Sequence, residues 1–167
     1  PQACARTVDL GGRAVAPVWM GTRVLSTRQY NAACAQTENK AVVNWALVAM
    51  LIEEALERAD GVPVEIIVDR QGGRVHYEDL LRQLFGADVR VVEKQPRRSA
   101  YEVDDDRVRS IEFRVDGDVD CMAVSVASIL AKYTRELLMA RLNRFFAGHQ
   151  PALEPTTGYF SDGNRFI

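Results

Sequence analysis

The run Val64–Asp69 (VEIIVD) and the two segments that follow it constrain the fold more than any other part of this chain. A short apolar run that ends in an acid and a turn sequence, here RQGG, is typical of a buried strand in a parallel sheet. Residues 77–85 have the pattern of a short helix that ends at Gly86, and residues 87–94 have the pattern of a second strand. The order strand, helix, strand predicts a right-handed βαβ unit and therefore an α/β fold.

The segments before this unit give weaker signals. Residues 13–25 predict one or two strands, and residues 26–39 look like a connection in which Thr37 is a candidate N-cap. Residues 38–59 predict a long helix, because apolar residues recur on one side of it. The apolar positions are Val42, Trp45, Ala46, Ala49, Ile52 and Leu56.

The segments after the unit complete one domain over residues 1–167. Residues 95–116 are polar around DDD and then alternate in SIEFRVD, which predicts an inserted hairpin. A second long helix is expected over residues 124–146, and residues 148–167 form a segment with Pro and Gly throughout, typical of a loop. The fold class expected from this order is α/β, with a mixed β-sheet flanked by helices.

Composition excludes little. A chain of 167 residues with 47% hydrophobic and 26% charged residues suits one globular domain. The net charge of −2 gives no global basic field, although a local basic stripe remains compatible with nucleic-acid binding. The longest apolar run is about half a membrane span and contains Asn44, so we expect no membrane partner. Cys4, Cys34 and Cys121 have no CxxC spacing, which favours a reducing cytoplasm over a disulfide framework or a zinc site.

Two aspartates are candidates for metal-assisted hydrolysis. Asp69 ends a predicted strand and Asp118 lies just before the second long helix, so both can reach one site. Such chemistry needs hard oxygen ligands gathered from separate elements. The alternative is that each is an ordinary turn or cap residue. Asp116, Asp118 and Asp120 alternate, and without further information they look like a solvated strand edge.

Three polar residues near the start of the second long helix are candidates for phosphate binding. Ser128, Lys132 and Arg135 are spaced i, i+4 and i+7, so they share one helical face. A hydroxyl, an ammonium and a guanidinium pointing the same way would suit the positioning of phosphates.

The alternative for this helix is an ordinary exposed polar face. Its apolar stripe, at Ile129, Tyr133 and Leu137, would then turn inward. His76 and His149 lack the spacing of metal ligands, and we expect both at the surface.

The segments VEIIVDRQGG, HYEDLLRQLFGADVRVVEK, DGDVDCMAVSVASILAKYTRELLM and TTGYFSD together resemble the type 2 ribonuclease H family (ribonuclease HII), especially its archaeal and eukaryotic branch. The most specific piece, ASILAKYTR, matches the family pattern A-S-I-x-A-K-x-x-R. Asp69 matches the family's V-D strand end, and Asp118 matches its aspartate ten residues before the serine. Gly158–Asp162 (GYFSD) is similar to the family's G-Y-P-S-D element.

The resemblance implies a ribonuclease H-like fold and endonucleolytic cleavage of the RNA strand of an RNA/DNA hybrid, or cleavage beside ribonucleotides embedded in DNA. In the family, four carboxylates hold two Mg²⁺ or Mn²⁺ ions, and Asp69 and Asp118 would be two of the four. Tyr159 would pack on the sugar at an RNA–DNA junction, and Ser128, Lys132 and Arg135 would lie near the backbone phosphates.

The family also opens with a strand that ends in D-E-x-G-R-G. The nearest match here is VDLGGRAV, in which Asp9 and Arg13 fit the pattern but Leu10 stands where the family has glutamate. The resemblance implies that Asp9 is a further catalytic carboxylate and that Arg13 senses the 2′-hydroxyl. Three interpretations remain open: a fragment, a shortened and divergent enzyme with weak metal affinity, or an inactive descendant. The rival from another class is a non-catalytic module that binds nucleic acid or protein.

Overall fold

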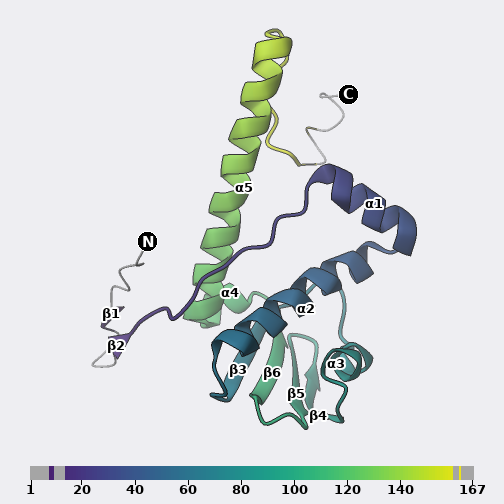
Figure 1. Cartoon of the computed structure of the whole chain (residues 1–167), viewed down its shortest axis with the longest axis vertical. Coiled ribbons are helices and arrows are strands. Elements are labelled where there is room, and N and C mark those ends of the chain that lie inside the picture. Colours follow the sequence, from purple (N-terminus) through teal and green to yellow (C-terminus); the bar gives the residue numbers. More distant parts are fainter. Residues whose placement is uncertain (1–7, 10–13, 160–161, 163–167) are drawn as a thin grey trace. The chain divides into compact units, whose positions relative to one another are not determined.

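The computed structural model describes residues 8–9, 14–159 and 162 of the chain. The chain divides into two compact units, residues 1–124 and residues 125–167, and each is described here by itself. The helices and strands are labelled in Figure 1. No helix in the described part of the chain combines the length and apolar character that crossing a membrane requires.

The first unit contains a four-stranded mixed sheet. Its strands are β3 (Val64–Asp69), β4 (Val89–Gln95), β5 (Arg98–Val103) and β6 (Val108–Arg114), in the spatial order β3-β6-β5-β4. β3 and β6 are parallel, whereas β6 with β5 and β5 with β4 are antiparallel. It follows that β3, β6 and β4 run in the same direction and end at the same edge of the sheet. The predicted α/β class with a mixed sheet is confirmed.

The predicted strand–helix–strand order is present, but its two strands are not neighbours. α3 (Glu78–Phe85) connects β3 to β4, and Gly86 ends this helix in the left-handed conformation expected of a C-cap. β6 and β5 lie between β3 and β4 in the sheet. Residues 95–116 therefore supply the two inner strands of the sheet rather than a peripheral addition.

Two helices cover one face of this sheet (Figure 1). α2 (Lys40–Arg58) confirms the predicted long helix, and the side chain of Asn39 caps it by accepting a hydrogen bond from the Ala41 N–H at 2.9 Å. Between the helices and the sheet, the rings of Tyr77 and Phe113 stack with centroids 3.5 Å apart. The buried core is completed by Trp45, Ile52, Leu56, Leu81, Val89, Tyr101, Val103, Val108 and Ile111.

The segment before α2 differs from the prediction. β1 (Val8–Asp9) and β2 (Ala14–Val15) form a short antiparallel pair, and residues 16–26 contain no strand, so the strand expected over residues 13–25 is confirmed only at its start.

The connection expected over residues 26–39 is mostly helical. α1 (Thr27–Thr37) begins at a capping box formed by Ser26 and Gln29, which satisfies the first N–H groups of the helix. Thr37 is the last residue of α1, and its hydroxyl donates to the Ala33 carbonyl. The prediction that Thr37 is an N-cap is therefore wrong.

α4 (Gly117–Asp120) is a single turn after β6, and α5 (Met122–His149) is the predicted second long helix. In the second unit, the segment after α5 folds back along the helix. The amide of Asn143 donates to the Thr156 carbonyl and accepts from the Thr156 N–H, at 2.9 and 3.0 Å.

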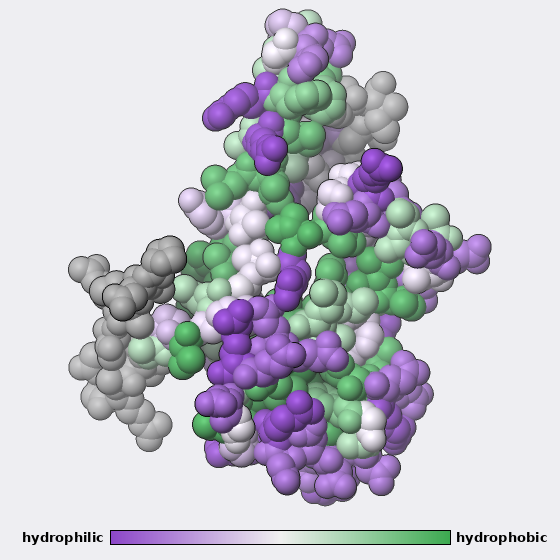
Figure 2. Space-filling view, in the orientation of Figure 1, coloured by the Kyte–Doolittle hydropathy of each residue, from purple (hydrophilic) through white to green (hydrophobic). Residues whose placement is uncertain are grey.

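The apolar stripe expected to turn inward on α5 is exposed instead. The exposed fractions are 66% for Ile129, 62% for Tyr133 and 54% for Leu137, so the inward orientation is wrong. Figure 2 shows hydrophobic residues along the surface of α5, whereas hydrophilic residues cover most of the visible surface of the sheet unit.

Candidate functional site

Asp69 lies at the edge of the sheet where the parallel strands end. It is the last residue of β3, and its Cα pairs with that of Arg114, the last residue of β6. Because β3 and β6 are parallel, the segment that follows β6 leaves the sheet beside Asp69. Ligand-binding and catalytic groups in α/β proteins gather at this edge of parallel strands.

A hydrogen bond joins Asp69 to that segment. The N–H of Gly117 donates to Oδ1 of Asp69 at 3.1 Å, and Gly117 is buried. Asp118 directly follows Gly117 in the chain, so its backbone lies next to the residue that binds the Asp69 carboxylate. The structure therefore brings the turn that carries Asp118 beside Asp69 in the first unit.

The turn that carries Asp118 is helical, not extended. Asp118 and Asp120 belong to α4, and Asp116 precedes it in the left-handed conformation, with φ 55°. The solvated strand edge expected for these three aspartates is therefore wrong. The hairpin turn between β4 and β5 holds Asp116 in place, because Arg97 binds its carboxylate at 2.7 Å and the Arg97 carbonyl accepts from the Val115 N–H at 2.9 Å.

The remaining predicted ligands are only partly described. Asp9 lies in β1, but its side chain is outside the described residues, as is the whole of Arg13. Within residues 16–159 and residue 162, no group of three or more His, Cys, Asp or Glu side chains is arranged to hold a metal ion. Two carboxylates with hard oxygen atoms, Asp69 and Asp118, are the donor chemistry that this edge offers to Mg²⁺ or Mn²⁺.

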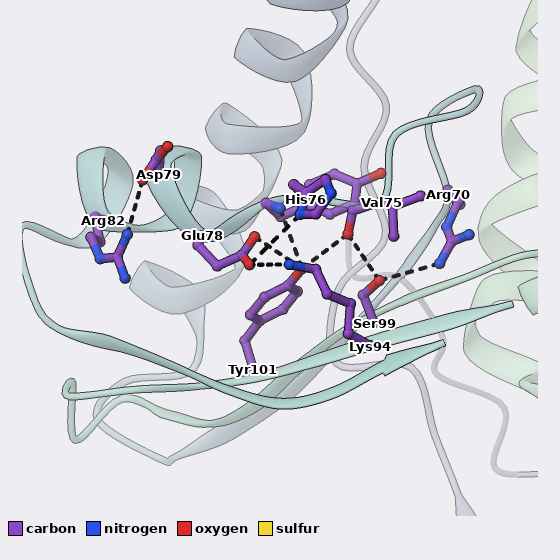
Figure 3. Close-up of polar contacts among 10 residues, drawn as sticks. Arg70, Val75, His76, Glu78, Asp79, Arg82, Lys94, Ser99 and Tyr101 are labelled. Carbon is purple, nitrogen blue, oxygen red and sulfur yellow. Dashed lines mark hydrogen bonds and ion pairs between the residues drawn. The ribbon is translucent and has the colours of Figure 1, made fainter. Parts of the chain in front are cut away.

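The loop that leaves Asp69, residues 70–77, is fixed to the sheet by side chains the sequence did not single out (Figure 3). Arg70 donates to Ser99 Oγ at 3.2 Å and to the carbonyls of Gln95 and Pro96 in the β4–β5 turn. Ser99 Oγ and the Tyr101 hydroxyl both donate to the Val75 carbonyl, at 3.1 and 3.2 Å. Ser99 and Tyr101 alternate along β5, and this period of two was the available signal that they share a face.

Three ionisable groups beside this loop, Tyr77, Glu78 and Tyr101, have displaced pKa values. Burial raises the pKa of Tyr77 and of Tyr101 further above neutral, and the protonated Tyr101 hydroxyl donates to the Val75 carbonyl. Burial also acts to raise the pKa of Glu78, but the hydrogen bond from Lys94 at 2.6 Å and further donors outweigh it, and the net pKa is lowered. Glu78 is therefore an ionised, paired carboxylate (Figure 3).

The second unit brings Arg135 and Tyr159 together. The Arg135 guanidinium lies 4.4 Å from the centre of the Tyr159 ring, donates to the Thr157 carbonyl and pairs with Glu136 at 2.6 Å. Tyr159 remains 62% exposed. A guanidinium over a ring face is a cation–π contact, so Arg135 is placed to orient the tyrosine.

Ser128 and Lys132 lie about two turns and about one turn before Arg135 on α5, as the spacing predicted. Ser128 is half-buried and Lys132 is exposed. The sequence therefore predicted the shared helical face, but not the contact between Arg135 and the returning segment.

Comparison of the chain with protein-family models, with curated proteins and with solved structures gives no match.

Proposed function

We propose that the chain is a ribonuclease H-like, metal-dependent endonuclease that hydrolyses the RNA strand of RNA/DNA hybrids, or cuts beside ribonucleotides embedded in DNA. The observation that carries the proposal is the hydrogen bond from the Gly117 N–H to Asp69, which keeps the Asp118 turn at the end of β3. A carboxylate at the end of β3 and a second one in the turn that follows the parallel strand β6, together with the ASILAKYTR helix start, support the resemblance to the type 2 ribonuclease H family.

In this proposal Asp69 and Asp118 bind Mg²⁺ or Mn²⁺, with Asp9 as a further carboxylate. A cation held by these residues would supply activation of the attacking water and stabilisation of the leaving 3′-oxygen. The hydrogen bond from the Gly117 N–H to Oδ1 restrains the orientation of the Asp69 carboxylate.

The remaining residues bind the substrate. Tyr159 packs on the sugar at the RNA–DNA junction, in the orientation that Arg135 fixes. Ser128 and Lys132 contact backbone phosphates, and Arg13 senses the 2′-hydroxyl. The location proposed is the cytoplasm, supported by three cysteines without disulfide spacing and by free thiols at Cys34 and Cys121.

The second candidate is a non-catalytic module that binds nucleic acid or a protein partner. The contact between Arg135 and Tyr159 favours it, because this pair is assembled within residues 125–167 and needs no metal. Such a module would bind an RNA/DNA hybrid equally well with and without divalent cations.

Calorimetric titration with Mn²⁺ tests the metal site. Wild-type protein should bind Mn²⁺, and D69N and D118N should each weaken binding about tenfold or more, because each removes a charged ligand. D106N changes an exposed turn aspartate and serves as the matched control. Equal Mn²⁺ affinity in all four proteins would contradict the proposed site.

A further inference from the structure

A groove of about 580 Å³ lies beside the loop that leaves Asp69. Its walls are Arg74 and His76 from the loop, the first turn and Arg82 of α3, and Val91 of β4. The proposed function assigns no role to these residues. Their charges and their anchoring indicate what the groove binds.

The acidic side chains of the groove are already paired. Glu78 binds Lys94 at 2.6 Å, and Asp79 binds Arg82 at 2.9 Å (Figure 3). Arg74, by contrast, has no ion-pair partner in the described part of the chain, and its guanidinium lies 5.8 Å from the centre of the Tyr77 ring. A planar cation without a carboxylate partner is suited to bind a phosphate through two N–H groups.

His76 adds a second donor to the same wall. Its side chain is 74% exposed, and its Nδ1 lies 3.9 Å from Glu78, beyond hydrogen-bond distance. The imidazole therefore reaches solvent beside Arg74. Together the two residues give the groove one cation that is unpaired among the described residues, at Arg74, and hydrogen-bond donors on the same wall.

The backbone that carries Arg74 and His76 is fixed from below. The carbonyl of Val75, the residue between them, accepts hydrogen bonds from Ser99 and Tyr101, and the Tyr77 N–H donates to the Tyr101 hydroxyl at 3.3 Å. Figure 3 shows the side chains of Ser99 and Tyr101 converging on the Val75 carbonyl. A loop that is held in one conformation before binding loses little entropy when a ligand binds.

We propose that Arg74 and His76 bind the backbone phosphates of the nucleic-acid substrate at a distance from the scissile bond. This inference rests on the proposed function for the identity of the ligand. The loop that carries both residues is fixed over β5, and two strand spacings, about 10 Å, separate β5 from β3. The phosphates bound there would lie about three nucleotides from the one at Asp69, at a rise of about 3.4 Å per nucleotide.

The test is the binding of a labelled 20-base-pair RNA/DNA hybrid, measured by fluorescence anisotropy in EDTA between 50 and 200 mM salt. The slope of log Kd against log salt should fall by about 1 in R74Q, because one phosphate contact is lost. Affinity should fall several-fold in R74Q and further in the R74Q/H76Q double variant. R74K keeps the charge and should keep most of the slope.

R109Q is the matched control, because Arg109 is an exposed arginine at the start of β6, at the opposite edge of the sheet. It should bind as wild type does. A wild-type slope in R74Q, equal losses in R74Q and R109Q, or no hybrid binding by folded wild type would each overturn the inference. Melting curves for all variants establish that they are folded.

The same duplex in Mn²⁺ separates this inference from the proposed function. If binding depends on Arg74 but no cleavage occurs, the phosphate-binding role of the groove is supported and the proposed nuclease activity is contradicted. If R74Q cleaves the duplex with the KM of the wild type, the proposed nuclease activity is supported and the phosphate-binding role of the groove is contradicted.

Discussion

The N–H of Gly117 donates to the Asp69 carboxylate at 3.1 Å, and this bond joins the end of β3 to the turn that carries Asp118. The two residues are separated by 48 positions in the sequence. The strand that brings them together is β6, which lies parallel to β3 and ends at the same edge. The geometry of the candidate site therefore depends on how the chain turns after β6.

Asp116 makes that turn in the left-handed conformation, with φ 55°, which is unfavourable for a residue with a Cβ atom. D116A and D116G both lose the ion pair with Arg97, but only alanine retains the steric conflict. We expect D116A to be less stable than D116G by about 1 kcal/mol in urea unfolding. Equal stability of the two variants would show that the conformation at residue 116 carries no strain.

Ser99 fixes the loop after Asp69 through two hydrogen bonds. It is fully buried, donates to the Val75 carbonyl at 3.1 Å and accepts from Arg70 at 3.2 Å. S99A leaves both partners without this hydroxyl, and we expect a loss of about 1–3 kcal/mol in the free energy of unfolding. S110A, in β6, is the matched control and should lose much less. A loss below about 0.5 kcal/mol in S99A would contradict the anchoring role.

Glu112 links charged residues across β5 and β6. Arg98 donates to it at 3.0 and 2.6 Å, and Arg114 donates at 2.8 Å. These guanidinium groups, Arg98 foremost, hold the pKa of Glu112 below its ordinary value of 4.5, against the opposing effect of burial. The ionised form therefore stabilises the folded state, fully above about pH 4.5, and this contribution disappears as the pH falls through the lower pKa of the folded state.

E112Q should accordingly lower the free energy of unfolding by about 2 kcal/mol at pH 7. The difference from wild type should shrink below pH 4.5, where protonation removes the same charge from the wild-type protein. E65Q changes an exposed carboxylate, 3.5 Å from Arg109, and should have little effect at any pH. A difference between wild type and E112Q that is constant down to pH 3 would contradict this account.

We expect Arg135 to influence substrate preference through its contact with the Tyr159 ring. R135Q removes the cation over the ring and the donor to the Thr157 carbonyl. We expect the preference for an RNA/DNA hybrid over a DNA duplex, measured as a ratio of Kd values, to fall about two- to fivefold.

R141Q makes the same charge change elsewhere on α5 and is the control for Arg135. It should weaken the binding of both duplexes to the same extent and leave the ratio of Kd values unchanged. If R135Q also weakens both alike, Arg135 is a phosphate contact and not a positioning residue.

The sequence predicted the elements that have strong periodicity. β3, α2, α3 and α5 lie within a few residues of their expected bounds, because runs of apolar residues and terminal signals mark them. α1 was missed because it has no buried residue and so no apolar stripe, and its capping box was the only local signal.

The position of Asp69 at a strand end was also predictable, whereas the contacts around it were not. The neighbour of β3 in the sheet is decided by packing over the whole unit, so β6 could not be identified as its partner from local pattern. Arg70 and Ser99, 29 positions apart, meet for the same reason.

The most direct test of the proposed nuclease is cleavage of a labelled DNA duplex that contains one ribonucleotide, in Mg²⁺ and in Mn²⁺. Wild type should cut at the ribonucleotide, D69N and D118N should lose the activity, and D106N should keep it. No cleavage by folded wild type that binds the duplex, or equal cleavage by wild type and D69N, would contradict the account.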